Sequence, residues 1–403
     1  MGGLVGASTP TFTRATTATY ADPGLLVATA ASGVRRNNHM AYAGTMARYY
    51  RSTLLEGART NLVIRSGDLT HAAWTAGPSY AVAGSQTDPF GGSTAVQITR
   101  SAAGTGNGVI STVFTYGSSA TKAALWFVKA GTAPTTGVNI FDNTAGATRV
   151  FVTLSWSGGV PTPSITAGAG TVHATVPLTN GWYAIFFSAN SCLVGNNHFT
   201  GCYINAPDAT PITTLAAAAQ SEDATFPSSY IPTTTAAVTR NSDDLSFPFP
   251  YAPQAMTVYC RHVEGGTLLN GTNSRAWAIG NPGSNNSFYL IPSGAGGAYR
   301  IAHKTAAGGT VTSTAAAGAS LGDLVETRAI LYADGSVALG QSVNSAAEVV
   351  AATSAANTLA AAWNALFFYV NGESGAPGYN AYANLAVLPG TASLAQCRAA
   401  ANV

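Results

Sequence analysis

Two stretches, Arg149–Trp156 (RVFVTLSW) and Trp182–Ala189 (WYAIFFSA), have the composition of buried β-strands. β-branched and aromatic residues dominate both, and these residues pack well on a pleated surface. The chain as a whole rarely places apolar residues at the i, i+3, i+4 spacing of an amphipathic helix beside good helix caps. The two stretches therefore predict strands.

Three further strand-like runs surround them: Val109–Tyr116 (VISTVFTY), Ala123–Lys129 (AALWFVK) and Cys202–Asn205 (CYIN). Clusters of Gly, Pro, Asn and Ser separate the runs, which is the spacing of a β-sandwich. Trp126 and Trp182 lie inside continuous apolar runs, so we expect both in the core.

A Pro- and Thr-rich stretch without periodicity, Phe226–Arg240 (FPSSYIPTTTAAVTR), reads as a connection between domains. Strand-like runs resume beyond it, with an Asp334-Gly335 hairpin turn and a short Ser-capped helix over Ser393–Ala401. The further runs are Met256–Arg261, Ala276–Gly280, Ser287–Ile291, Ala298–His303, Thr327–Tyr332, Ser336–Leu339, Leu366–Val370 and Leu385–Leu388.

These patterns predict an all-β fold with two consecutive antiparallel, jelly-roll-like β-sandwich domains after an irregular N-terminal arm. The expected boundaries are 1–63 for the arm, 64–235 for the first sandwich and 236–403 for the second. The 403 residues are 46% hydrophobic but only 8% charged, against about 25% charged in ordinary globular proteins. Disordered chains combine few hydrophobic residues with high net charge, so the composition favours a folded, loop-rich body.

The net charge of +2 is unevenly distributed, because residues 1–65 hold seven arginines against Asp22 and Glu56, a balance of +5 that leaves −3 for the rest. A basic arm favours docking to an acidic partner surface, whereas the alternative is local pairing and packing of the long side chains. Lysine is nearly absent and no binding module accompanies the cluster, so nucleic acid is not an expected partner. The arginines expected to attach the chain to its partner are Arg35, Arg36, Arg48, Arg51 and Arg59.

Residues 1–10 do not form a legible signal peptide, and no run of about 20 apolar residues is present. We therefore expect synthesis in the cytoplasm and no membrane insertion. The four cysteines lack the spacing of a zinc site. Cys192 and Cys202 flank a predicted turn at residues 195–197, so they are either a disulfide across a hairpin or, as cytoplasmic synthesis favours, two buried thiols.

Catalytic motifs are weak. Gly318–Gly322 (GASLG) matches a G-x-S-x-G pattern, but this motif requires a strand-to-helix turn and a strand is predicted to follow. The six histidines have no partners at metal-binding spacing, and no phosphate loop is present. The acidic pairs Glu222-Asp223 and Asp243-Asp244 have no recognisable aromatic cleft, unlike the carboxylates of a glycosidase. We expect no enzymatic activity, no metal and no cofactor.

Saccharide binding is a better match to the composition, because six tryptophans and 17 tyrosines offer flat faces for sugar rings. Loop residues with polar side chains could hold hydroxyl groups. The candidate saccharide-binding residues are Asn285, Asn286, Glu373, Tyr379 and Asn380.

Five stretches then point to a family, and they are TFTRATTATY (11–20), LLEGARTNL (54–62), AAWT (72–75), NGWY (180–183) and EDATFPSSYIPTTTAAVTRNSDDL (222–245). In this order they resemble virion proteins of tailed phages and gene transfer agents, described as head spikes, head fibres or tail-associated carbohydrate-binding proteins. The C-terminal region, with WAIG at 277–280, looks like a concanavalin A or laminin-G sandwich. The resemblance implies a virion location and saccharide binding, and it carries no named ligand residues.

We therefore expect a non-enzymatic virion surface protein, made in the host cytoplasm, that attaches to capsid or tail proteins through its arm. Its first sandwich is expected to be carbohydrate-binding-module-like, and the sandwiches would bind host surface polysaccharide. The alternatives are a purely structural capsid or tail cementing protein and a capsular polysaccharide depolymerase. Spikes and fibres are symmetric assemblies, so a homo-oligomer is expected, while head and tail placement stay open.

Overall fold

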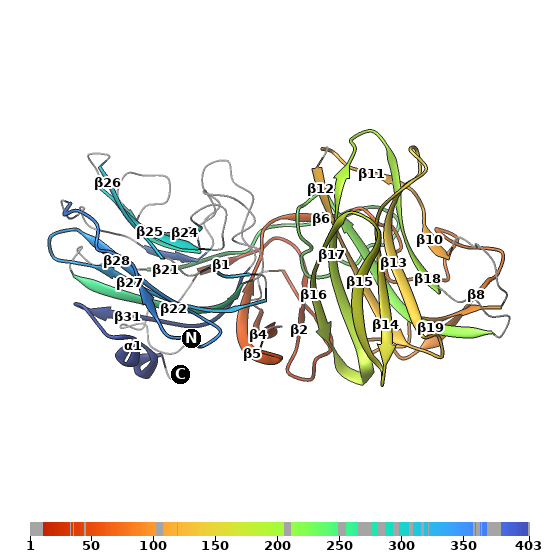
Figure 1. Cartoon of the computed structure of the whole chain (residues 1–403), viewed down its shortest axis with the longest axis horizontal. Helices are drawn as coiled ribbons and strands as arrows, with labels where there is room; N and C mark the ends of the chain where they lie inside the picture. The colour runs from red at the N-terminus through yellow and green to blue at the C-terminus, as the bar shows by residue number, and fades with distance from the viewer. Residues whose placement is uncertain are drawn as a thin grey trace. The chain divides into compact units, whose positions relative to one another are not determined.

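The structure is a computed structural model. It describes residues 11–32, 34, 36–43, 46–101, 108–118, 120–204, 211–248, 255–264, 276–280, 287–292, 298–305, 309–315, 318–320, 322–357, 359, 363, 365–368 and 380–401. The fold is all-β, as the sequence predicts, and the strands of its four large sheets pair antiparallel (Figure 1).

The chain forms two compact units whose segments alternate along the sequence. Unit 1 contains residues 1–17, 30–58 and 241–403, and unit 2 contains residues 18–29 and 59–240. The predicted first sandwich at 64–235 falls inside unit 2. Unit 1 combines residues 241–403 of the predicted second sandwich (236–403) with segments from the N-terminal region.

Unit 2 is a sandwich of two sheets, which we call the β14 sheet and the β12 sheet. The β14 sheet has the order β15 (Val160–Gly168), β14 (Ala147–Ser157), β13 (Thr135–Asp142), β18 (Asn197–Ile204), β10 (Val109–Ser111) and β7 (Trp74–Ala76), with β11 (Phe114–Thr115) also on β18. The β12 sheet has the order β16 (Gly170–Pro177), β17 (Trp182–Cys192), β12 (Ala120–Ala130), β19 (Ile212–Glu222), β9 (Ala95–Arg100) and β8 (Tyr80–Gln86). Two small pairs, β2 (Ala18–Ala21) with β3 (Val27–Ala30) and β6 (Arg59–Asn61) with β20 (Val238–Arg240), and a 3-10 turn at Thr179–Gly181 complete the described elements of this unit.

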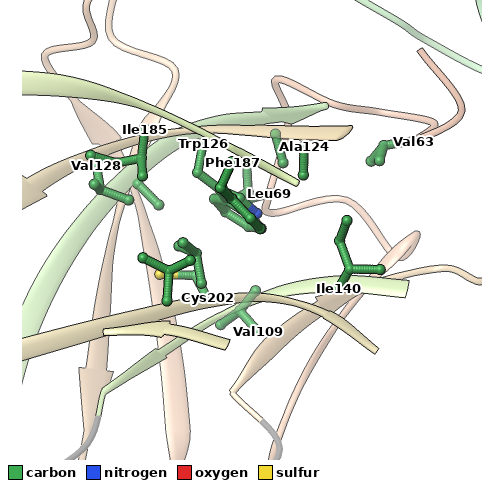
Figure 2. Close-up of a cluster of buried hydrophobic side chains, with 14 of the residues drawn as sticks. Val63, Leu69, Val109, Ala124, Trp126, Val128, Ile140, Ile185, Phe187 and Cys202 are labelled. Atoms are coloured by element: carbon green, nitrogen blue, oxygen red, sulfur yellow. The ribbon is translucent and has the colours of Figure 1, made fainter. Parts of the chain in front are cut away.

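The core of unit 2 lies between its sheets (Figure 2). Trp126 and Val128 point into it from β12, and Ile140 and Cys202 point into it from β13 and β18. Trp126 and Trp182 are both fully buried, as predicted, although Trp182 packs in a second cluster on the other face of the β12 sheet.

Unit 1 is also a sandwich of two sheets, the β24 sheet and the β22 sheet. The β24 sheet has the order β1 (Thr11–Thr13), β21 (Asp244–Pro248), β30 (Ala365–Phe368), β23 (Trp277–Gly280), β24 (Ser287–Pro292), β25 (Tyr299–Lys304) and β26 (Thr310–Thr314). The β22 sheet has the order β29 (Val349–Val350), β28 (Val337–Val343), β27 (Leu324–Leu331), β22 (Met256–Glu264), β31 (Asn380–Pro389), β5 (Arg48–Leu55) and β4 (Arg36–Ala43). The helix α1 (Leu394–Ala400) follows β31.

Two local predictions in unit 1 are confirmed. Gly335 has a φ of 77°, and its N–H donates to the carbonyl of Tyr332 (3.0 Å) in the turn between β27 and β28. Glycine adopts this left-handed conformation without steric cost. Ser393 caps α1 in a capping box with Gln396, which satisfies backbone donors at the start of the helix.

The irregular arm predicted over residues 1–63 is wrong for the described part of this segment. β1 pairs with β21, and β5 joins the edge of β31, so both sheets of unit 1 include N-terminal strands. β6 instead pairs with β20 in unit 2. The segment is a structural part of both units.

A buried ion cluster explains why the N-terminal segment folds into unit 1. We define the cluster by Arg14, Arg36, Glu56 and Asp243, whose side chains are at most 1% exposed. Asp243 accepts hydrogen bonds from Arg14 Nη1 (3.0 Å), from the Glu56 N–H (2.8 Å) and from Arg36. Burial alone would lower the pKa of Arg36, but Asp243 and Glu56 outweigh burial and raise it. Arginines that look unpaired in the N-terminal sequence thus find a partner more than 200 residues away.

The predicted connection at Phe226–Arg240 is also wrong, because much of this stretch packs within unit 2. Phe226, Tyr230 and Ile231 are buried, and the Tyr230 hydroxyl is 2.8 Å from Ser66 Oγ. Proline and threonine remove periodicity from the sequence, but an irregular backbone is buried when side chains satisfy its polar groups. The chain passes into unit 1 after Arg240.

Candidate functional site: an aromatic sheet face

Four aromatic side chains lie on the outward face of the β14 sheet. Alternate residues of a strand point to opposite faces, and Val138, Ile140, Val150, Val152 and Cys202 point into the core. The residues between them therefore point outward. We define the aromatic face by Phe141 on β13, Phe151 on β14, and Phe199 and Tyr203 on β18.

The strand register places these rings in two contacting pairs. Phe141 is directly opposite Phe199, and their rings are stacked with centroids 4.9 Å apart. The rings of Phe151 and Tyr203 approach from either side of β13, with centroids 5.3 Å apart and a tilt of 54°. Phe141, Phe151 and Tyr203 are partly exposed, so the face presents aromatic surface to solvent.

Two glycines allow the rings to lie against the backbone. A Cβ atom at Gly137 would overlap the Phe151 ring, and one at Gly201 would lie 2.9 Å from a ring carbon of Tyr203. An aromatic ring over a strand glycine shields the exposed backbone, which is a stabilising arrangement. It also holds the ring flat on the sheet in a fixed position.

Asn139 fixes the position of Tyr203. It is 2% exposed, and its amide nitrogen donates to the Tyr203 hydroxyl at 3.2 Å. Among the residues that the structure describes, none forms a hydrogen bond with its carboxamide oxygen. Burial raises the pKa of Tyr203, so the phenol is neutral and its hydroxyl is a hydrogen-bonding group rather than a charge.

The two sheets of unit 2 differ in how their outward faces are covered. On the β12 sheet, Leu125, Phe127 and Trp182 are buried in a cluster with Val27 and Tyr230, which come from outside the sheet. No comparable cluster of buried residues covers the outward face of the β14 sheet within the described ranges. Exposed aromatic patches mark interaction sites more often than random surface, so this face is the candidate functional site.

A polar network fixes one end of the aromatic face. Asp142 accepts from Arg149 Nε (3.2 Å), from Asn196 Nδ2 (2.8 Å) and from the Ala145 N–H (2.9 Å). Burial alone would raise the pKa of Asp142, but these hydrogen bonds outweigh it and lower the pKa to about 2. The carboxylate therefore joins the β13–β14 turn to the β17–β18 turn, next to Phe141 and Phe199.

Exposed hydroxyl groups continue the face toward its edge. Ser155 and Thr162 are directly opposite each other on β14 and β15, and Ser164 is opposite Thr153, which points to the same side as Phe151. We define the hydroxyl row by the exposed residues Ser155, Thr162, Ser164 and Thr166. Pro161 and Pro163 on the edge strand β15 lack N–H donors, which disfavours pairing with another strand there.

The saccharide-binding residues predicted from loops are not part of this face. Asn285, Asn286, Glu373 and Tyr379 lie outside the described residues. The backbone of Asn380 begins β31 in unit 1, opposite Glu264 of β22 and Leu55 of β5.

The predicted attachment arginines fall in different environments. Arg36 is buried in the ion cluster, so its prediction as an attachment residue is wrong, because its guanidinium is enclosed by Glu56 and Asp243. Arg48 and Arg51 are exposed on β5. Arg59 belongs to unit 2, where its guanidinium lies 5.1 Å from the centroid of the Phe226 ring. Arg35 lies outside the described residues.

The groups considered for catalysis have structural contacts. Glu222 is buried and accepts from the Ser228 N–H (2.7 Å), while Asp223 pairs with Lys122, so the two carboxylates serve different partners. Ser320 precedes β27 rather than a helix, which leaves the G-x-S-x-G match without its required context. Within the described residues, no group of three or more His, Cys, Asp or Glu side chains is arranged to hold a metal ion.

The four cysteines are buried free thiols. Burial raises the pKa of Cys192 and of Cys202 to about 12, which leaves both protonated and unreactive at neutral pH. Cys192 and Cys202 are therefore two buried thiols and do not form a disulfide across the hairpin. Among the helices described, none has the length and hydrophobicity needed to cross a membrane.

The residues of the aromatic face went unrecognised in the sequence, although a signal was present. In RVFVTLSW, Phe151 lies between Val150 and Val152, whose side chains point into the core, so the side chain of Phe151 points away from the core. An aromatic residue in the outward register of an antiparallel strand is unusual when that face meets solvent. Tyr203 follows the core residue Cys202 in β18, so the same alternation places its side chain on the outward face.

Comparison with known proteins adds no family assignment: the chain matches no protein-family model and no curated protein.

Proposed function

We propose that this chain is a non-enzymatic virion structural protein that binds host surface polysaccharide through unit 2. It would act as a head spike, head fibre or decoration protein, in a symmetric assembly of several copies. The observation that carries the proposal is the aromatic face, in which rings lie flat on a sheet face that no comparable buried cluster covers among the described residues. Sugar rings have apolar C–H faces, and flat aromatic surfaces with nearby polar groups suit them.

Four ionisable groups of unit 2 have pKa values that do not suit general acid or base catalysis near neutral pH. Catalytic acids and bases have pKa values near the working pH, whereas Asp142, Cys192 and Cys202 are shifted away from neutrality. His173 is similar, because burial lowers its pKa to about 4.

We propose that attachment to other virion proteins uses the exposed arginines of β5. Arg48 and Arg51 lie on β5, which pairs with the edge strand β4 of the β22 sheet, so their backbone is held in a sheet rather than in a flexible arm. An acidic surface on a capsid or tail protein is the expected partner.

Binding to host cells tests the polysaccharide function. The purified full-length protein should bind wild-type host cells and fail to bind a mutant lacking surface polysaccharide. Equal binding to both cell types would reject the function. Particles that are unstable without the protein but adsorb normally would favour a cementing role, and release of reducing ends from purified capsule would indicate a depolymerase.

A further inference from the structure

We infer that the ligand of the aromatic face is an uncharged saccharide, which presents a C–H face to Phe151 and Tyr203 and its hydroxyl groups to the hydroxyl row. This inference rests on the proposed function and specifies its ligand class. It follows from the charge, the shape and the hydrogen-bonding groups of one sheet face.

The face is electrically neutral. Apart from His198, the charged side chains described on β13, β14, β15 and β18 are Asp142 and Arg149, and the Arg149 guanidinium contacts the Asp142 carboxylate at 3.2 Å and 2.5 Å. Asp142 is fully buried and ionised, so the pair has no net charge. An anionic ligand would lose hydration on this face without meeting an unpaired cation, which is costly.

The rings form a preorganised apolar surface. Phe151 lies against Gly137 and Tyr203 against Gly201, so neither ring has to order itself when a ligand arrives. Preorganised aromatic residues contribute strongly to binding because little side-chain entropy is lost.

The polar groups beside the rings match hydroxyl groups rather than charges. Ser155, Thr162, Ser164 and Thr166 both donate and accept hydrogen bonds, as saccharide hydroxyls do. The Tyr203 hydroxyl, positioned by Asn139, adds a neutral hydrogen-bonding group at the ring end. A single face therefore offers stacking and uncharged hydrogen bonds side by side.

A glycan array with two classes of probe tests the inference on the full-length protein. Neutral glucan, galactan and mannan oligosaccharides form one class, and polygalacturonate and polysialic acid fragments form the other. We expect binding to at least one neutral probe, with affinity changed less than about twofold between low and high salt, since screening affects charged contacts. Phe151→Leu and Tyr203→Leu should each weaken that binding about tenfold or more, as expected for central interface residues.

Both variants keep an apolar side chain over the glycine. Tyr203→Leu also removes the acceptor of the buried Asn139 amide, so circular dichroism and thermal unfolding check that each variant is folded before binding is compared. Tyr332→Ala, a partly buried aromatic of unit 1, is the control and should bind like the native protein. Salt-sensitive binding to acidic probes alone would overturn the inference and leave the proposed function standing. Neutral binding that survives both Leu variants would overturn the assignment to this face. Binding to no glycan and to no host cell would reject the proposed function itself, and loss of self-association in the Leu variants would identify a second copy as the occupant.

Discussion

Replacing Asp243 with alanine should destabilise unit 1 and leave unit 2 unchanged. Asp243 is fully buried and accepts from Arg14, Arg36 and the Glu56 N–H. Its removal leaves two buried guanidinium groups facing one carboxylate, Glu56. The native cluster has two positive and two negative charges, whereas the variant would have two positive charges and one negative charge.

The magnitude follows from the cost of an uncompensated buried charge. Breaking a buried ion pair by removing one partner costs about 3–5 kcal/mol, so the free energy of unfolding of unit 1 should fall by that amount. Asp243→Asn keeps the size and one acceptor oxygen but removes the charge, so it should lose most of the same free energy.

Glu348→Ala is the matched control within unit 1. Glu348 pairs with Arg328, but their side chains are 16% and 11% exposed, and Arg328 also donates to the carbonyl of Ala392 (3.0 Å). The freed guanidinium would keep one partner and reach water, so a clearly smaller loss is expected.

Urea unfolding followed by hydrogen exchange of peptides from each unit measures the two stabilities separately. Peptides from β4, β5 and β21 should open at lower urea in the Asp243 variants, whereas peptides from β12 and β13 should not shift. A loss below about 1 kcal/mol would refute the buried cluster. A loss shared equally by both units would refute its location in unit 1.

Three other outcomes follow. Asp142→Asn should lower the free energy of unfolding of unit 2 by about 2 kcal/mol at pH 7, because the pKa of Asp142 is about 2 in the folded state and near 4 in the unfolded state. In acid denaturation, the stability difference between the variant and the native protein should vanish as the pH falls through about 2. Burial lowers the pKa of His173 to about 4, so between about pH 6.5 and 4 the unfolded chain binds a proton that the folded chain does not, and unit 2 loses stability. His173→Gln should reduce this loss of stability. An unchanged dependence of unit 2 stability on pH would contradict this. Deleting residues 1–60 should expose unit 1 to rapid proteolysis, since β1, β4 and β5 are lost from its sheets, and a protease-resistant unit 1 would argue for a dispensable arm.

The sequence was sufficient to predict the class of fold. Apolar strand runs such as Ala123–Lys129 and turns such as Asp334-Gly335 act locally, so composition and spacing reveal them. The core positions of Trp126 and Trp182 followed from the same runs.

Contacts between distant segments could not be predicted. The partners of Arg36 include Asp243, 207 residues away, and no local pattern connects them. The charge balance along the chain predicts a basic arm, whereas the pairing of these charges depends on the fold. The sequence also does not show that segments of the chain alternate between the two units, because this depends on pairing between distant strands. β6 and β20, for example, are more than 170 residues apart.

The candidate site was missed because exposure depends on which face of a sheet is covered. Phe127 and Phe151 both stand in apolar strands, yet Phe127 is buried by segments from outside its sheet and Phe151 is partly exposed. The register showed that Phe151 points away from the core, but only the structure shows that its face lacks a comparable covering cluster in the described ranges. The loop residues favoured instead were selected for polarity alone.

Hydroxyl-radical footprinting of the protein with bound host polysaccharide shows whether the aromatic face is the binding surface, because exposed phenylalanine and tyrosine rings are oxidised in place. Bound polysaccharide should protect Phe141, Phe151 and Tyr203, while the oxidation of Tyr332 in unit 1 stays unchanged. Protection confined to unit 1, or unchanged oxidation of all three rings in the bound state, would contradict it.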